Sequence, residues 1–366
     1  MTAEPLGRLR RIPWPLIVPV LALAILVATW GRSPGTTVLV VVGIFLALAV
    51  PVAVHHAEVV AHRVGEPFGS LVLAVAVTVI EVGLIVSLMA SGGSETDTLA
   101  RDTVFAAVMI TCNGVVGISL VVATLRQRVA TFNAEGSATA FATVITLATL
   151  CLVLPTFTTS APGPEFTSTQ LAFAGIASVA LYALFVFVQN VRHRDFFLAV
   201  EADPAPAPAH APLPSLRTTA VSLGALVLSL VAVVGLAKVE SPAIEDAADA
   251  IGAPQSAVGV AIALLVLLPE TFAAYRNARR GRLQTSFNLA YGSAVASIGL
   301  TIPAVALASI WLDGSLVLGL DSTQIVLLVL TAGVGALTIL PGRATLQEGG
   351  VHLVILAAFL LLAVNP

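Results

Sequence analysis

Long apolar runs separated by short polar segments make up most of the chain. Eleven of these runs are close to the ~20 residues that a helix needs to cross the hydrocarbon core of a bilayer. We therefore predict an all-α membrane protein with about 11 transmembrane helices, the first of them an uncleaved span. The predicted spans cover residues 13–30, 36–54, 68–90, 103–125, 137–157, 168–190, 218–238, 255–275, 285–311, 323–340 and 349–364.

Composition narrows the classes of protein that fit this pattern. Of the 366 residues, 58% are hydrophobic and 10% are charged, and the mean hydropathy is +1.01. Soluble domains carry about 25% charged residues, so the chain lacks the polar shell of a soluble enzyme, a nucleic-acid binder or a disordered scaffold. We expect a surrounding lipid bilayer and no nucleic-acid partner. Cys112 and Cys151 both lie in apolar runs, which excludes a disulfide framework and a cysteine metal cluster.

The distribution of basic residues predicts the orientation of the spans. With the N-terminus in the cytoplasm, 14 of the 17 Lys and Arg residues fall in cytoplasmic segments, and only Arg32, Arg101 and Lys238 fall outside. This positive-inside bias predicts a cytoplasmic N-terminus and an external C-terminus. The acidic residues of the external segments, Asp102 among them, either concentrate cations at an entrance or form a plain solvated surface.

A Pro/Ala-rich segment divides the chain into two groups of five spans. Residues 191–217 contain Asp203-Pro204-Ala205-Pro206-Ala207-Pro208, a composition typical of an extended linker. Because five is an odd number, two homologous five-span units must insert in opposite directions, as in the inverted repeats of many transporters. The predicted domains are residues 1–35 (N-terminal tail and first span), 36–190 (first five-helix repeat), 191–217 (cytoplasmic linker) and 218–366 (second five-helix repeat).

Two glutamates lie deep within predicted spans, whereas the other 18 of the 20 acidic residues fall in loops or tails. Glu81 and Glu270 each lie in the second span of a five-span unit, after an unbroken apolar approach. A carboxylate at this depth costs several kcal/mol unless it is paired, protonated or facing water. Inverted packing would bring the two together near the midplane. The alternative is a protonated glutamate that bonds to a neighbouring helix.

Two facing carboxylates also imply a chemistry. Without a cation, repulsion and desolvation favour the protonated form, whereas a bound cation stabilises both ionised forms. Proton and cation then compete for one site, as antiport requires. Ca²⁺ binds about six to eight oxygens, and Asn113, Ser293 and Ser297 of the following spans are candidate metal ligands. The simpler roles are an interhelical hydrogen bond for Asn113 and bonds to the helix backbone for Ser293, Ser297 and Thr301.

Several stretches resemble the calcium/proton (cation/proton) antiporters of the bacterial ChaA type, within the calcium/cation antiporter superfamily. These stretches are His62–Ser70 leading to Val79-Ile80-Glu81-Val82, Leu268-Pro269-Glu270 leading to Gly292–Ser297, and Gly342-Arg343 with His352-Leu353. The resemblance implies that residues around 62–120 and 255–303 are α-repeats. It also implies that Glu81 and Glu270 are the essential acids and carry the protons as well as the cation, with Asn113 and Ser297 beside them. The central loop lacks the strongly acidic segment that relatives often carry, so regulation through such a segment is not expected.

The expected function is a secondary antiporter that exports Ca²⁺ in exchange for H⁺ by alternating access, in a bacterial inner (plasma) membrane. Na⁺ or K⁺ in place of Ca²⁺ at the same site is one alternative, and a cation channel is another. The chain contains neither a His-Glu-x-x-His motif nor a phosphate-binding loop, so we expect no enzyme, no ATP-driven pump and no cofactor. His55, His56 and His62 form either a zinc or pH-sensing site or an interfacial segment. No oligomeric state is predicted.

Overall fold

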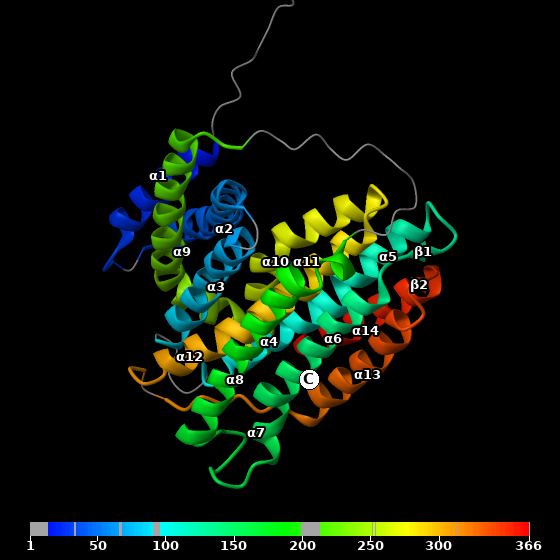
Figure 1. The fold of residues 1–366 in the computed structure, drawn as a ribbon. Coiled ribbons are helices and arrows are strands. Elements are labelled where there is room, and N and C mark those ends of the chain that lie inside the picture. The colour runs from blue at the N-terminus through cyan, green and yellow to red at the C-terminus, as the bar shows by residue number, and fades with distance from the viewer. Residues whose placement is uncertain are drawn as a thin grey trace, which may run out of the picture.

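The computed structural model describes residues 14–32, 34–65, 68–90, 96–198, 213–250, 252, 254–312 and 314–365. The predicted N-terminal tail, most of the predicted linker, and Glu66 and Pro67 of the resemblance motif lie outside the described residues. The described chain is almost entirely helical (Figure 1). Ten of its helices are long and apolar enough to cross a membrane, and one further apolar helix is shorter. The predicted all-α architecture with about 11 membrane helices is therefore confirmed.

Several spans consist of consecutive helical segments joined without a break, some of them π-helical. The elements up to the linker are α1 (Trp14–Thr29), α2 (Thr36–Val64), α3 (Phe68–Met89), α4 (Leu99–Met109), η2 (Ile110–Val115), α5 (Val116–Thr124), β1 (Ala130–Thr131), α6 (Ala134–Ala148), η3 (Thr149–Val153), α7 (Leu154–Phe157), α8 (Ser168–Phe187), η4 (Val188–Arg192) and η5 (Arg194–Phe197). After it follow α9 (Leu216–Ala250), α10 (Gln255–Arg279), α11 (Leu283–Ala296), η6 (Ser297–Thr301), α12 (Ile302–Ala308), α13 (Ser322–Ile339), β2 (Arg343–Ala344) and α14 (Leu346–Val364).

Two helices extend well beyond their predicted spans. The second span was expected to end near residue 54, but α2 continues to Val64, and α9 continues to Ala250 instead of ending near 238. Apolarity marks where a helix leaves the bilayer, whereas the helix itself ends only at a breaking signal. For α2 that signal is Gly65, whose φ of 76° favours glycine. The predicted histidine cluster thus lies on α2, and the buried His56 has its Nε2 2.9 Å from the carbonyl oxygen of Pro15.

The outer surface of the bundle suits a lipid environment. Large apolar side chains such as Ile176 on α8 and Val329 on α13 are exposed. The three tryptophans of the sequence, Trp14, Trp30 and Trp311, lie at or just beyond helix ends and are exposed as well. Tryptophan is enriched at the two membrane–water interfaces, where its polar N–H and apolar ring face different surroundings. The chain is a multi-pass integral membrane protein.

Buried apolar residues form two clusters. One consists mainly of residues from α1, α2, α3 and α9, with α2 packed along α9. The other is built mainly from α4 to α8 and from α11 to α14. In Figure 1 the first group lies on the left and the second in the centre and on the right. α10 contributes residues to both clusters, so the helix that carries Glu270 lies at their boundary.

The two groups of five helices share one order. The glutamate helix α3 is followed by the span α4–η2–α5, and the glutamate helix α10 is followed by α11–η6–α12; each following span has a π-helical middle. The last helix of each group packs on the π segment of the other. A Cβ on Gly114 of η2 would lie 3.1 Å from Leu356 of α14, and a Cβ on Gly299 of η6 would lie 2.9 Å from Tyr182 of α8. Reciprocal packing of this kind is expected of two inverted repeats.

The two ends of the bundle differ in charge. At one end of the bundle α5, η4 and α10 finish and α11 and α14 begin. We call this end the basic end, because many arginines lie at or near it, and we call the other end the opposite end. The loops of the basic end are joined by the antiparallel pair β1–β2 and by a hydrogen bond from the backbone N–H of Asn133 to Oε1 of Gln284 at 2.7 Å. The arginines at or near the basic end are Arg126, Arg128, Arg192, Arg194, Arg276, Arg279, Arg280, Arg282 and Arg343.

Candidate functional site

Glu81 lies in the middle of α3, 13 residues or about 20 Å of helix after Phe68. Its side chain is only 3% exposed. Two hydroxyls of η6 donate to it: Ser297 Oγ to Oε1 at 2.6 Å, and Thr301 Oγ1 to Oε2 at 2.9 Å. The simpler expectation for Ser297 and Thr301 was a bond to the backbone of their own helix. The structure shows that both hydroxyls donate to Glu81 instead. The π-helical segment places both hydroxyls on the face that meets α3.

Glu270 lies on α10, 15 residues or about 22 Å of helix after Gln255. It follows Pro269, which has no N–H and therefore leaves a carbonyl of the preceding turn without its helical donor. The Oε2 atom of Glu270 is buried, and it has no hydrogen-bond partner within the part of the chain that the structure describes. The second carboxyl thus differs from the first, because one of its oxygens is free.

Both glutamates line one cavity of about 350 Å³. One of its walls is α11, from Thr285 to the beginning of η6 at Ser297, which is 12 residues or about 18 Å of helix. The other walls come mainly from α3, α8 and α10. The exposed Arg194 lies at the rim, so the cavity extends from the middle of the bundle to the basic end. The structure therefore brings the two predicted glutamates to the same cavity.

Oxygen atoms are the groups that a cation would meet beside the glutamates. Ser293 and Thr78 line the cavity together with Ser297. Among the described residues, no group of three or more His, Cys, Asp or Glu side chains could hold a metal ion. The two carboxyl groups, the neighbouring hydroxyls and water from the cavity are the oxygen donors that a hard cation would meet at this place.

Asn113 lies in a different part of the core. It is buried in η2, and it is not one of the residues that line the cavity. Its Nδ2 donates to Oγ1 of Thr331 at 3.0 Å, and its Oδ1 lies 3.1 Å from Nδ1 of His352. The Nε2 of this histidine lies 3.1 Å from Oγ1 of Thr338. Because an amide oxygen only accepts, His352 donates from Nδ1 and accepts at Nε2. Asn113 thus makes the interhelical bonds that were its simpler predicted role.

Part of the cavity lining was not predicted. Asn288 lines it from α11 and donates from Nδ2 to the carbonyl oxygen of Phe197 at 2.7 Å. Gln189 and Thr78 line it from the neighbouring helices. The sequence carries a signal for α11, because Thr285, Asn288, Gly292 and Ala296 recur at helical spacing and form one polar or small-residue face.

Replacing Asn113 by leucine is expected to lower stability more than transport. Asn113→Leu removes the Asn113 partner of Nδ1 of His352 and of Oγ1 of Thr331, which keeps its 3.6 Å contact with Sδ of Met109. The cost is about 1–3 kcal/mol for an unsatisfied buried group, while the glutamate cavity stays intact. We expect a lower apparent Tm of the purified protein and an unchanged KM for the transported cation. The double variant Asn113→Leu/His352→Leu should recover part of the lost stability. An increase in KM of more than about tenfold (about 1.4 kcal/mol) at an unchanged Tm would instead assign Asn113 to the cation.

A membrane-embedded helical bundle with two carboxyl groups on a cavity open at one end belongs to the class of ion transporters. The family described as sodium/calcium exchanger protein matches residues 34–191 and 221–365, which include both groups of five helices. The chain belongs to the sodium/calcium exchanger protein family. It is a cation antiporter and not an enzyme, and it needs no cofactor for transport.

Relatives cover nearly the whole chain. A Sinorhizobium fredii protein described as an ionic transporter, y4hA, is 45% identical over 356 residues, which are 96% of each chain. The sodium-potassium/proton antiporter ChaA of Escherichia coli is 31% identical over 351 residues, which are 94% of each chain. The predicted resemblance to antiporters of the ChaA type is therefore confirmed.

Solved structures share the fold. Native YfkE has a TM-score of 0.72 at 15% sequence identity and covers 96% of this chain and 100% of its own. The H⁺/Ca²⁺ exchanger CAX has a TM-score of 0.65 at 18% identity and covers 96% of this chain and 92% of its own. At these identities the similarity concerns the arrangement of the helices.

Proposed function

We propose that the protein exports Ca²⁺ in exchange for H⁺, with Glu81 and Glu270 as the shared binding site of both ions. The observation that carries this proposal is the pair of carboxyl groups on one cavity. One of them is bonded to two hydroxyls, and the other has a buried oxygen with no hydrogen-bond partner among the described residues. A free carboxylate oxygen beside a second carboxyl is ready to bind either a proton or a cation.

Competition between the two ions follows from the surroundings of the carboxyl groups. Two negative charges in a low-dielectric cavity repel each other and lose hydration, so without a cation at least one group takes up a proton. A bound divalent cation reverses this preference because it stabilises both negative charges. Each ion therefore displaces the other, which couples their movement in opposite directions.

The proposed cation ligands are the oxygens nearest these carboxyl groups. Glu81 and Glu270 supply the charge, and Ser293 and Ser297 supply hydroxyl oxygens from the same cavity. Ca²⁺ requires about six to eight oxygens at about 2.3–2.6 Å. These four side chains offer six oxygens if both carboxylates bind through both of theirs, and water from the cavity would occupy the remaining positions. Mobile water in the shell also suits a site that must release its ion in every cycle.

The direction of transport is proposed from the charge of the two ends. Cytoplasmic segments of membrane proteins are enriched in Arg and Lys, so we place the basic end and the N-terminus in the cytoplasm of a bacterial inner membrane, with the C-terminus outside. The glutamate cavity reaches the basic end and would collect Ca²⁺ from the cytoplasm. Residues 36–190 and 218–366 are the proposed inverted repeats, whose relative movement would then expose the site to the other side.

Exchange of Na⁺ or K⁺ for H⁺ at the same glutamates is a second candidate. It is favoured by one specific observation, the 31% identity to a protein named as a sodium-potassium/proton antiporter. Monovalent cations also bind carboxylate and hydroxyl oxygens, but one positive charge compensates two carboxylates less completely than two charges do. The same site with one carboxyl still protonated would suit a monovalent ion.

An ion panel on the purified full chain in proteoliposomes tests both candidates. With an imposed pH gradient and a pH-sensitive dye inside the vesicles, we expect addition of Ca²⁺ to release protons at a rate that saturates with Ca²⁺. A response to Na⁺ or K⁺ without any response to Ca²⁺ would replace the first candidate with the second. Cation flux that persists without movement of protons would contradict antiport altogether. Empty liposomes provide the background rate.

A further inference from the structure

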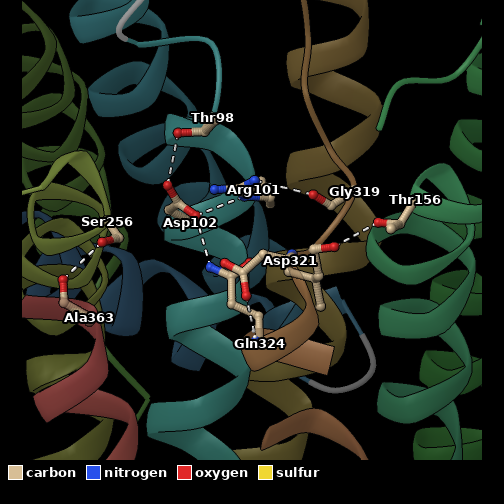
Figure 2. A network of polar contacts seen from close by, with 10 residues as sticks. Thr98, Arg101, Asp102, Thr156, Ser256, Gly319, Asp321, Gln324 and Ala363 are labelled. Carbon is tan, nitrogen blue, oxygen red and sulfur yellow. Dashed lines mark hydrogen bonds and ion pairs between the residues drawn. The ribbon is translucent and has the colours of Figure 1, made fainter. Parts of the chain in front are cut away.

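A second cavity, of about 390 Å³, lies at the opposite end of the bundle. We call it the outer cavity, and the glutamate cavity the inner cavity. The starts of α4, α10 and α13 and the end of α14 form its walls. Figure 2 shows the polar network at this place, with Asp102 at its centre. Of the two alternatives for the external acidic residues, the plain solvated surface is wrong for Asp102, because α4 begins at Leu99, before the predicted span, and Asp102 is only 3% exposed.

The inner and outer cavities approach each other along α10. Ser256 and Val260 line the outer cavity, whereas Ala263 and Leu267 line the inner one. These four residues are spaced by three or four and therefore share one face of the helix. Val260 and Ala263 are three residues apart, which corresponds to about 4.5 Å along the helix axis. One turn of α10 thus separates the two cavities on a continuous helix face.

Close packing of α10 on α4 seals this partition. A Cβ added to Gly259 would lie 2.9 Å from the backbone nitrogen of Thr103 and 3.0 Å from the Cβ of Asp102. Distances this short leave no room for water or an ion between the two helices. Along α4 and α10, the described residues thus leave no opening from the glutamates to the opposite end, whereas the inner cavity reaches the basic end.

The two cavities are lined by equivalent helices, with the roles of the first and second groups of five helices interchanged. The inner cavity lies between the glutamate helix α3 and the last helix α8 of the first group and the π-containing span α11–η6 of the second. The outer cavity lies between the glutamate helix α10 and the last helix α14 of the second group and the π-containing span that starts with α4 in the first. The difference is depth, because the inner cavity reaches both glutamates and the outer cavity stops at Val260.

We propose that the outer cavity is the second mouth of the ion path, held shut in this conformation by contacts that α4 and α10 make with their neighbours. This proposal rests on the proposed exchange at Glu81 and Glu270. It adds the route by which a hydrated cation leaves and a proton enters on the other side of the membrane, and it assigns positioning residues to the gate of that route.

Three hydrogen bonds hold this gate. Arg101 donates from Nη1 to the carbonyl oxygen of Gly319 at 3.2 Å, which joins α4 to the segment before α13. Gln324 of α13 donates from Nε2 to Oδ1 of Asp102 at 3.2 Å. Ser256 donates to the carbonyl oxygen of Ala363 at 2.9 Å, which joins the start of α10 to the end of α14 (Figure 2).

The charged groups at the gate, Arg101 and Asp102, remain paired with each other when the gate opens. Asp102 is also held within its own helix, by Oγ1 of Thr98 at 2.9 Å and by Nε of Arg101 at 2.8 Å. These two contacts move with α4 and keep the carboxylate paired when the contact with Gln324 breaks. Of the three bonds between helices, only that of Ser256 joins two neutral groups. The bonds of Arg101 and Gln324 each have one charged partner, but both charged groups keep the Arg101–Asp102 ion pair when these bonds break. Opening therefore leaves no unpaired buried charge, and water that enters the cavity replaces the broken bonds.

A reversible cross-link across the gate tests the proposal. In Ser256→Cys/Ala363→Cys, an oxidant should join α10 to α14 and reduce Ca²⁺-dependent proton release from proteoliposomes by at least about tenfold (about 1.4 kcal/mol), and dithiothreitol should restore it. The native Cys112 and Cys151 are buried, and the oxidised wild type accounts for any effect through them. Cross-linked protein that transports at the rate of the reduced protein would overturn the gate and leave the proposed exchange standing.

A matched control lies at the same end of the bundle. Glu165 and Val317 face each other in an antiparallel bridge and do not line the outer cavity. The cross-link in Glu165→Cys/Val317→Cys should therefore leave transport unchanged. If the reduced proteins and the wild type show no proton-coupled cation transport, the proposed function fails, and this outcome differs from failure of the gate alone.

Labelling at the partition provides a second measurement that needs no cross-link. In Val260→Cys, a membrane-impermeant cationic methanethiosulfonate added from the opposite end should react during turnover and stop transport. The same reagent should leave the wild type active. A Cys at position 260 that stays unreactive while the protein transports would show that the ion path does not pass through the outer cavity.

Discussion

Glu270→Gln is expected to abolish proton-coupled cation transport and to leave the protein folded. The amide has nearly the shape of the carboxyl group, but it can neither take up a proton nor carry negative charge. Removing one partner of a buried charge contact costs about 2–5 kcal/mol, so transport should fall by at least about 30-fold. The free, buried Oε2 makes no hydrogen bond within the described residues that the substitution would break. Proton release from proteoliposomes on addition of Ca²⁺ measures the rate, and size-exclusion chromatography with an apparent Tm reports folding.

A second glutamate-to-glutamine change controls for this result. Glu135 is exposed at the start of α6, near the basic end and away from the cavity lining. Glu135→Gln removes one negative charge from the same chain and should leave the rate within about twofold of the wild type, because exposed charges contribute about 0–1 kcal/mol. Transport that survives in Glu270→Gln would contradict a site made of two glutamates.

Much of the fold was predictable because charge is scarce in the chain. With 10% charged residues, apolar runs stand out, and any acid inside one is conspicuous. Glu81 and Glu270 were found in this way, and the structure places both on one cavity. Ser297 could be named because it lies in the span that follows a glutamate span. These predictions use only distance along one helix or between adjacent helices, which the sequence encodes directly.

The remaining features depend on contacts between distant segments. The partners of Asn113 lie 218 and 239 residues further along the chain, and nothing local distinguishes an amide that bonds His352 from one that binds an ion. The environment of Asp102 was also predicted wrongly. Its position before an apolar run suggested a solvent-exposed side chain. However, α4 begins at Leu99, before the predicted span, and α10 and α13 cover the first turn of this helix. Helix starts are set by local capping, whereas burial is set by packing.

Ser297→Ala/Thr301→Val should weaken cation binding strongly, and more so at acidic pH. Both hydroxyls donate to Glu81, and donors of this kind favour the ionised carboxylate. Without them the ionised carboxylate that binds the cation loses two hydrogen bonds, so the cation binds more weakly and competes less well with protons. A hydrogen bond to a charged group contributes about 1.5–3 kcal/mol. We therefore expect KM for the cation to rise at least about tenfold, measured in proteoliposomes over a range of pH.

The pH dependence distinguishes two ways in which these hydroxyls could act. If they act through the proton on Glu81, the increase in KM should shrink at alkaline pH, where few protons compete. If they act only as direct cation ligands, the increase should be the same at every pH. A matched double variant, Ser229→Ala/Thr271→Val, removes two hydroxyls whose bonds within the described residues go to the backbone of their own helices, and its KM should stay near that of the wild type. A KM for Ser297→Ala/Thr301→Val equal to that of this control would contradict any role of the η6 hydroxyls in ion binding, because Ser297 and Thr301 donate to Glu81 whereas the two hydroxyls of the control bond to helix backbone.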